Sequence, residues 1–227
     1  EIMSSYGKKT ERSLIVDYKD IIKDDHAWSP QRYFKFIEGD IETFTIEDVT
    51  LSINRGAIIR SNDLDKHISQ EENEYRYLEL RNIKDGLIDD DLPYLENPDE
   101  KWLKHTIHHS NIIISKTFPF KIARVESKFS RNTIATGNLY FLEVDKSKIS
   151  SFYLAAYLES DMGQAQLEKY ATGSVIKMLS IRDLKKVQIP ALPLDKQEEI
   201  GKKYMLNLMG AEKHRKELDK LEKQKKA

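Results

Sequence analysis

The chain has 227 residues and a mass of 26.5 kDa, which is enough for one substantial domain with attachments or for two small domains. It contains no cysteine, which excludes a disulfide framework and a thiolate metal site and is compatible with a cytoplasmic setting. No apolar run approaches the roughly 18 residues that a membrane span requires, so we expect a soluble protein.

The formal net charge of -1 conceals an uneven distribution of charge along the chain. Residues 1–100 carry 13 Lys and Arg against 24 Asp and Glu, residues 101–195 carry 14 against 8, and residues 196–227 carry 10 against 6. Within residues 101–131, seven Lys and Arg residues are opposed only by Glu126. Such a local cationic surface is typical of nucleic-acid binding, although a solvated basic face without a partner is the alternative.

The first two parts of the chain differ in composition. Residues 1–35 are polar and acidic and are interpreted as an N-terminal extension. Residues 36–145 contain strand-like runs separated by turn signals such as Asp85-Gly86 and Gly137-Asn138. The runs are TFTIEDVTLSI, YRYLELRNI, NIIIS, KIARV and NLYFLEV. This pattern predicts a domain rich in β-sheet.

A helix is predicted over residues 151–171. Phe152, Ala155, Leu158 and Met162 recur there at roughly helical spacing, and the glycine at position 173 is typical of a helix C-terminus.

The stretch that follows this helix changes character three times. Ser180 with Asp183 three residues on is a capping-box pattern, which predicts a short helix. The apolar residues from 187 to 192 then alternate as in a strand, but Pro190 and Pro193 remove amide donors. We therefore expect an edge strand or an exit path from the domain.

A second capping-box pattern, Asp195 with Glu198, predicts a solvated C-terminal helix. Its heptad-like seam runs in steps of four and three residues through Ile200, Tyr204, Asn207, Ala211, His214, Leu218 and Leu221. Because few other apolar residues precede solvent, we expect this helix to pair with another helix. Packing against its own domain is the alternative.

The C-terminal part of the sequence resembles a known family. The stretch from Gly173 to Ile200, followed by a long charged helix, is similar to the end of a target recognition domain in the specificity subunits of type I restriction-modification enzymes. The upstream segments SINRGAIIR, YLELRNIKDG, NIIISKTFPFKIARV and TGNLYFLEVD follow the same order, so the resemblance covers roughly residues 40–227. Residues 16–34 resemble the tail of the adenine methyltransferase subunit of these systems, which would imply a fusion of the two parts.

The resemblance implies an α+β fold with three regions. They are an N-terminal extension or methylase tail at 1–35, a twisted mixed β-sheet target recognition domain with flanking helices at 36–195, and a long spacer or dimerisation helix at 196–227. It implies that the domain reads one half of a bipartite site in double-stranded DNA. The expected protein partners are a methyltransferase subunit or domain, a restriction subunit, and a second copy or second recognition domain joined through the helix. No cofactor is expected on this chain, whereas S-adenosylmethionine is expected in the methylase part.

Candidate DNA contacts follow from the chemistry of phosphates and base edges. Lysine and arginine bind phosphates, arginine pairs with guanine and asparagine with adenine. The candidates are Arg55, Arg60, Lys116, Lys121, Arg124, Lys128, Arg131, Asn132 and Lys177. The sequence departs from the family after the turn at residues 115–117. Phe118 and Phe120 stand there where the family often has glycines, which affects the path of this loop toward DNA.

The sequence allows three other readings. Asp99 with Glu126 and Lys128 has the loose spacing of a metal-dependent nuclease. A histidine cluster at 105, 108 and 109 could bind a metal, but surface or phosphate-contacting histidines are the favoured reading. A scaffold that holds enzyme subunits without reading DNA is the main alternative function. No methyltransferase motif or nucleotide-binding glycine loop occurs, so no catalytic residue is predicted.

Overall fold

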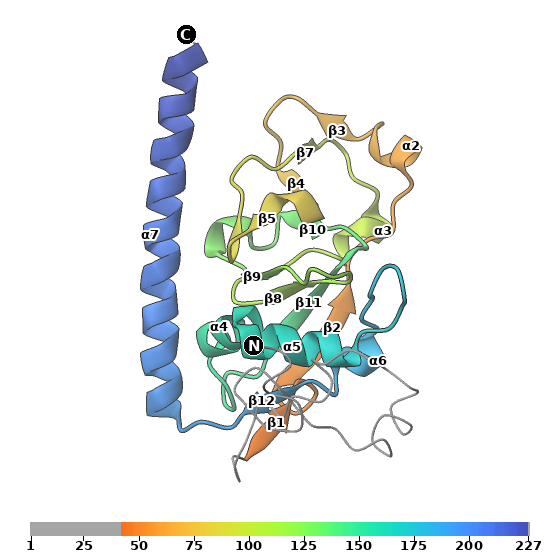
Figure 1. The fold of residues 1–227 in the computed structure, drawn as a ribbon. Coiled ribbons are helices and arrows are strands. Elements are labelled where there is room, and N and C mark those ends of the chain that lie inside the picture. Colours follow the sequence, from red (N-terminus) through yellow and green to blue (C-terminus); the bar gives the residue numbers. More distant parts are fainter. Residues whose placement is uncertain (1–41, 227) are drawn as a thin grey trace, which may run out of the picture. The chain divides into compact units, whose positions relative to one another are not determined.

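The computed structural model describes residues 42–226 (Figure 1). The predictions for residues 1–35, and for the first residues of the domain, lie outside this part of the chain. No helix within residues 42–226 is long and apolar enough to cross a membrane.

The central sheet contains four antiparallel strands in the order β2-β11-β8-β9. These strands are β2 (Thr50–Arg55), β11 (Leu139–Val144), β8 (Ile112–Ser115) and β9 (Ile122–Arg124). β11 lies in the middle, so Phe141 is opposite Asn54 on one side and Ile113 on the other. β8, β9 and β11 match separate runs predicted from the sequence, whereas the single run predicted at 43–53 is divided by a turn into β1 (Thr43–Thr45) and β2.

Both faces of the central sheet are buried. Ile112 and Ile114 belong to one hydrophobic cluster, whereas Ile113 belongs to a second one. Successive side chains of a strand point to opposite faces, so an uninterrupted apolar run supplies both clusters. The helices α4 (Ser151–Glu159) and α5 (Asp161–Tyr170) contribute to the first cluster and cover that face.

The predicted helix over residues 151–171 is divided into α4 and α5 at Ser160. The Ser160 hydroxyl oxygen accepts a hydrogen bond from the Gly163 amide at 3.2 Å and so caps the second helix. A Cβ atom at Gly163 would lie 1.9 Å from the Tyr157 carbonyl oxygen, so this close turn requires glycine. Spacing alone did not reveal the break, because the apolar residues continue across it.

A second four-stranded sheet has the order β10-β4-β7-β3 and is mixed. The strands are β10 (Thr133–Ala135), β4 (Tyr75–Leu78), β7 (Tyr94–Leu95) and β3 (Ile68–Ser69), with β10 and β4 parallel. Its apolar cluster includes Tyr77, Trp102 and Ile134. Beside it lie α2 (Ser61–Leu64) and α3 (Glu100–Leu103), whose apolar side chains join this cluster. The hairpin of β5 (Ile83–Lys84) and β6 (Leu87–Ile88) packs against β9 instead, and the 3-10 turns η3 (Leu80–Asn82) and η4 (Ser127–Phe129) contribute to the second cluster of the central sheet. The predicted α+β class is confirmed, with the strands divided between separate sheets.

The Ser180 capping-box prediction and the edge-strand prediction are confirmed. The second predicted cap is wrong, because the C-terminal helix begins at Leu194 and Asp195 lies in its first turn. The Ser180 hydroxyl oxygen accepts a hydrogen bond from the Asp183 amide at 3.1 Å, and α6 (Ile181–Leu184) follows. Next, β12 (Gln188–Pro190) pairs antiparallel with β1 (Thr43–Thr45) in a sheet of two strands. In this sheet the missing amide of Pro190 leaves the pairing intact.

The C-terminal helix α7 (Leu194–Lys226) stands beside the domain, next to α4 (Figure 1). Its first half packs against α4. The Gln197 side-chain oxygen accepts a hydrogen bond from the Ser150 amide at 2.9 Å, and the Tyr204 hydroxyl donates to Glu159 at 2.7 Å. Farther along, Arg215 forms an ion pair with Asp89 at 2.7 Å. The alternative that α7 packs on its own domain is therefore confirmed for this half.

This packing corrects the predicted seam at Tyr204, whose side chain faces the domain instead of a second helix. Gly201 and Leu208 contact the domain, whereas Ile200 and Leu218 of the heptad-like seam are exposed. At about 100° per residue, the face of α7 that contacts the domain is therefore turned by about 80° around the helix axis from the face that carries the seam. The other seam residues, Asn207, Ala211, His214 and Leu221, are exposed as well. Their pairing with another helix stays a prediction.

Candidate nucleic-acid interface

Four segments meet at one end of the central sheet, and we call them the loop cluster. They are residues 55–60 after β2, 116–121 between β8 and β9, 136–138 before β11, and 172–179 between α5 and α6. Since the sheet is antiparallel, the end of β2, the end of β8 and the start of β11 lie at the same edge.

Backbone hydrogen bonds join these segments into one surface. The Gly137 amide donates to the Ala57 carbonyl at 2.7 Å, and the Lys116 amide donates to the Asn138 carbonyl at 2.9 Å. The Leu179 amide donates to the Lys116 carbonyl at 2.9 Å. The loop cluster is therefore held by the core of the domain.

The segments of the loop cluster are free of acidic residues. Residues 51–62, 110–125, 127–142 and 169–182 contain no aspartate or glutamate. Glu168 of α5, which lies just outside these ranges, forms an ion pair with Lys177. An acid-free surface of this kind attracts an anionic partner.

Five predicted DNA contacts lie in the loop cluster, namely Arg55, Arg60, Lys116, Lys121 and Lys177. Arg60 is exposed and Lys116 is half-buried, and neither side chain forms a hydrogen bond or ion pair with another described residue. Arg55 Nε donates to the Gly137 carbonyl at 2.7 Å. Lys177 is paired with Glu168 and its ammonium lies 5.9 Å from the centre of the Phe118 ring. Arg60 and Lys116 are thus the cations of this group that are available to phosphates.

Three candidates, including Lys121 of the loop cluster, bind other groups of the same chain with their charged atoms. Lys121 Nζ donates to the Leu80 carbonyl at 3.0 Å. Lys128 Nζ lies 2.7 Å from Asp90, 3.5 Å from Glu126 and 3.6 Å from Glu212 of α7. Burial acts to lower the pKa of Lys128, but these three carboxylates outweigh it and raise that pKa. The third candidate, Arg124, is the most extensively bonded.

Arg124 links the central sheet to the start of α4. Its Nε donates to the Ser151 hydroxyl at 2.9 Å, its Nη2 donates to the Ser110 hydroxyl at 2.7 Å, and the guanidinium lies 3.8 Å from the centre of the Phe152 ring. Burial lowers its pKa, while Glu126 acts in the opposite direction. These contacts describe a structural residue, and its predicted role at a base edge remains untested.

We expect Arg124→Ala to lower the free energy of unfolding by about 1–3 kcal/mol, because two partly buried hydrogen bonds and a cation–π contact are lost. Urea denaturation measures this effect, and Arg60→Ala, at an exposed position, is the matched control that should change stability by less than about 0.5 kcal/mol. Equal unfolding midpoints for the two variants would contradict the structural role.

The remaining candidates lie at the other end of β10 from the loop cluster. Arg131 is exposed and has a φ of 71°, in the left-handed region. The next residue, Asn132, is half-buried and its carbonyl accepts a hydrogen bond from the Arg76 amide at 2.8 Å. The structure therefore does not bring all of the predicted DNA contacts together, and the basic window of residues 101–131 is divided.

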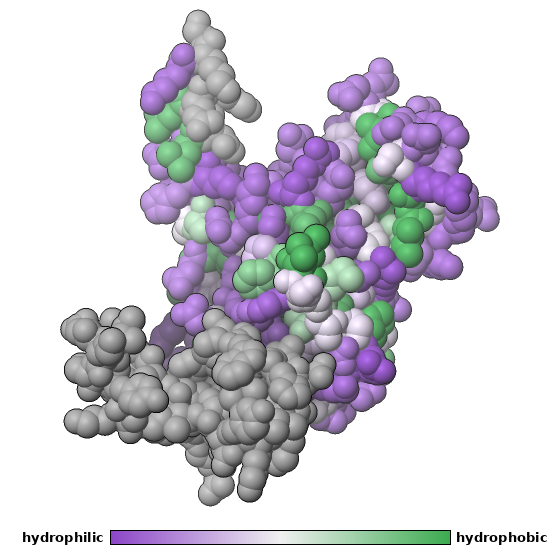
Figure 2. All heavy atoms as spheres, turned by 45° about the vertical axis from the view of Figure 1, so that its right-hand side comes forward, coloured by the Kyte–Doolittle hydropathy of each residue, from purple (hydrophilic) through white to green (hydrophobic). Residues whose placement is uncertain are grey.

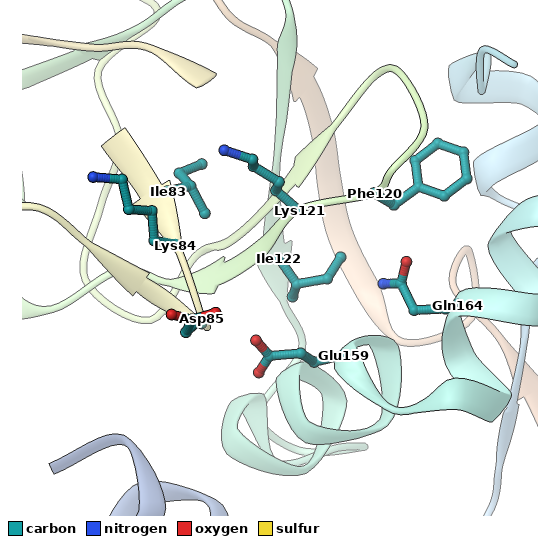
Figure 3. A pocket seen from close by; sticks show the side chains of 9 residues that line it. Ile83, Lys84, Asp85, Phe120, Lys121, Ile122, Glu159 and Gln164 are labelled. Atoms are coloured by element: carbon teal, nitrogen blue, oxygen red, sulfur yellow. The ribbon is translucent and has the colours of Figure 1, made fainter. Parts of the chain in front are cut away.

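A pocket of about 380 Å³ lies between the β5–β6 turn, β9 and the two helices α4 and α5 (Figure 3). Its lining includes Lys84, Lys121, Glu159 and Gln164. Burial raises the pKa of Glu159, and the hydrogen bond from Tyr204 opposes this change. In Figure 3 the Lys84 and Lys121 side chains extend away from Glu159, so these groups do not form a catalytic constellation.

The structure gives the nuclease and metal readings no support in the described part of the chain. The Asp99 carboxylate accepts a hydrogen bond from the Lys101 amide at 3.1 Å and caps α3. Glu126 takes part in the Lys128 ion-pair group. Among residues 42–226, no group of three or more His, Asp or Glu side chains could hold a metal ion.

The fold is similar to the folds of several known proteins, although the sequence is not. No family model matches the sequence, and no curated protein matches it either. The HsdS subunit from Thermoanaerobacter tengcongensis is similar in structure, with a TM-score of 0.56 and 17% identity over 79% of this chain and 45% of that one. A structure that describes complex assembly and conformational transition of the type I R-M system has a TM-score of 0.56 and 15% identity, over 88% and 47%.

The type IIG restriction endonuclease BpuSI also matches, with a TM-score of 0.53 and 11% identity over 72% of this chain and 26% of that one. The chain thus spans less than half the length of each of these proteins. The fold implied by the resemblance is confirmed: over about four fifths of its length, the chain shares the fold of an HsdS subunit.

Proposed function

We propose that this chain is a non-catalytic, sequence-reading component of a restriction-modification methyltransferase, which binds one half of a bipartite site in double-stranded DNA. The observation that carries the proposal is the loop cluster, where four acid-free segments form one surface on an HsdS-like fold. Loops held by a rigid sheet are suited to placing side chains against base edges.

The proposed protein partners are a methyltransferase subunit or domain and a restriction subunit. The exposed residues of α7, among them Ile200, Leu218 and Leu221, could pair with the helix of a second copy or a second recognition domain. S-adenosylmethionine would be bound by the methylase part, since this proposal assigns no cofactor to the chain itself.

A scaffold without DNA reading is the second candidate, and a specific observation favours it. Lys121, Arg124 and Lys128, which are central to the basic window, are all bonded to groups of the same chain. The two candidates differ in how DNA binding depends on salt, because phosphate contacts release counterions and a scaffold would lack them.

The test is selection from a randomised duplex library at several salt concentrations. We expect one motif to be enriched and the logarithm of the binding constant to fall linearly with the logarithm of the salt concentration. Lys116→Ala should weaken all sequences alike and reduce this slope by about one unit, whereas Lys202→Ala on the exposed side of α7 should not. Binding that shows neither a motif nor a salt dependence would favour the scaffold.

Arg131→Ala tests base reading by the separate group at the start of β10. Its side chain is exposed, so the fold should tolerate the change. If Arg131 pairs with a base, the variant should lose about 1–3 kcal/mol on the selected site and relax the choice at one base pair. The same library selection measures this, and an unchanged motif would remove Arg131 from the set of base contacts.

A further inference from the structure

The loop between α5 and α6 exposes two neighbouring β-branched side chains. Val175 is 93% exposed and Ile176 is 61% exposed. Single exposed apolar residues are common on protein surfaces. Here, however, Ile58, Phe118 and Met178 of the same loop cluster are exposed too, so three segments share the apolar surface. Figure 2 turns this side of the molecule forward and shows hydrophobic atoms among hydrophilic ones in the middle of the face.

The loop that carries these residues is braced at its base. The Thr172 amide donates to the Met178 carbonyl at 2.9 Å, and the Met178 amide donates to the Thr172 carbonyl at 2.7 Å. Leu179, the next residue, is fully buried, and its carbonyl accepts a hydrogen bond from the Tyr140 hydroxyl at 2.9 Å. The core therefore fixes both ends of a short loop whose tip is apolar.

Gly173 allows the chain to turn within this loop. It has a φ of +116°, and a Cβ atom there would lie 2.2 Å from the Ile176 carbonyl oxygen. The backbone thus folds back closely upon itself and presents Val175 at the apex. A tip of this shape is small enough to enter a groove.

The charges around the tip indicate what it contacts. Lys177 of the same loop is paired with Glu168 of α5. Lys116, whose carbonyl accepts a hydrogen bond from the Leu179 amide, has no ion-pair partner among residues 42–226. No acidic residue occurs from residue 169 to residue 182. An apolar tip beside an unpaired lysine is complementary to bases flanked by phosphates, as in proteins that insert aliphatic side chains between base steps.

We propose that Val175 and Ile176 form an apolar wedge that contacts the bases of the bound duplex and opens a base step, while Lys116 lies toward the phosphates. This assignment rests on the proposed function and adds to it a contact that is independent of charge. Removing the wedge should therefore weaken binding without changing the number of counterions released.

The test compares the double variant Val175→Ser, Ile176→Ser with the wild-type full chain bound to its partner subunits. The probe is the duplex selected from the library, with 2-aminopurine placed at successive positions to report unstacking. We expect affinity to fall tenfold or more, since burial of one aliphatic side chain is worth about that factor. The salt slope should be unchanged, and the rise in 2-aminopurine fluorescence seen with the wild type should be lost.

Two control variants accompany this test. Leu51→Ser removes a 64% exposed aliphatic side chain from β2, outside the loop cluster, and should leave affinity and fluorescence unchanged. Val175→Leu with Ile176→Leu keeps the tip apolar and should retain both affinity and fluorescence change.

Each remaining outcome contradicts either the proposed wedge or the proposed function on which it rests. The wedge is wrong if the serine variant binds and unstacks the duplex like the wild type, or if the wild type gives no fluorescence change. It is equally wrong if the serine variant keeps its DNA affinity but loses the methyltransferase subunit, because the tip is then a protein-docking surface. If the wild-type complex does not bind DNA at all, the proposed function fails as well.

Discussion

Deletion of the whole C-terminal helix after Asp195 is expected to unfold the domain or reduce its stability by several kcal/mol. Gln197 is only 1% exposed, and its side chain accepts from the Ser150 amide at 2.9 Å and donates to the Leu192 carbonyl at 2.8 Å. Each buried polar group that loses its partner costs about 1–3 kcal/mol, against a total stability of about 5–15 kcal/mol for a domain. A helix that only paired with a second helix could instead be removed while the domain stayed folded.

A shorter truncation provides the control. A chain that ends after Lys216 keeps Gln197, Tyr204 and Arg215, and therefore retains the contacts with α4 and the ion pair with Asp89. Urea denaturation of the two truncated chains should show a cooperative transition near that of the full chain for the longer one only. Equal midpoints for both would mean that α7 contributes nothing to the stability of the domain.

The substitution Gly56→Ala is expected to destabilise the protein by about 3 kcal/mol and to disturb the loop cluster. A Cβ atom at this position would lie 2.1 Å from the Thr136 carbonyl oxygen and 2.4 Å from that of Ala135. Both atoms belong to the backbone that leads into β11, so they cannot move aside as a flexible side chain would. The strain should therefore displace residues 136–138 from residues 55–60.

Gly210→Ala is the matched control, because a Cβ atom there would meet nothing within 4 Å. In the middle of α7 this change should stabilise the helix by about 0.5–1 kcal/mol. The denaturation midpoint should fall for Gly56→Ala and rise for Gly210→Ala. Binding to the library-selected duplex is measured for both variants and should weaken for Gly56→Ala. If Gly56→Ala instead unfolds at the wild-type midpoint, the close approach of these two segments is not as the structure describes it.

The sequence by itself determined the local features of this protein. The Ser180 cap, the strand with Pro190 at its end and the strand at residues 112–115 depend on neighbouring residues, and all three agree with the structure. Their energies come from short-range hydrogen bonds and from the period of the side chains along the backbone, both of which the order of residues reveals. The family resemblance extended this local reading to the fold.

The tertiary structure alone decided which cations are free and which face of α7 meets the domain. Lys116 and Lys128 are equivalent in the sequence, yet Lys116 has no ion-pair partner among the described residues while Lys128 contacts Asp90 and Glu212. In α7, Tyr204 fits a heptad seam as well as it fits a contact with Glu159. These partners come from distant parts of the chain. The sequence shows the charge and the spacing of a residue, but these are the same whether or not folding brings a partner side chain to it.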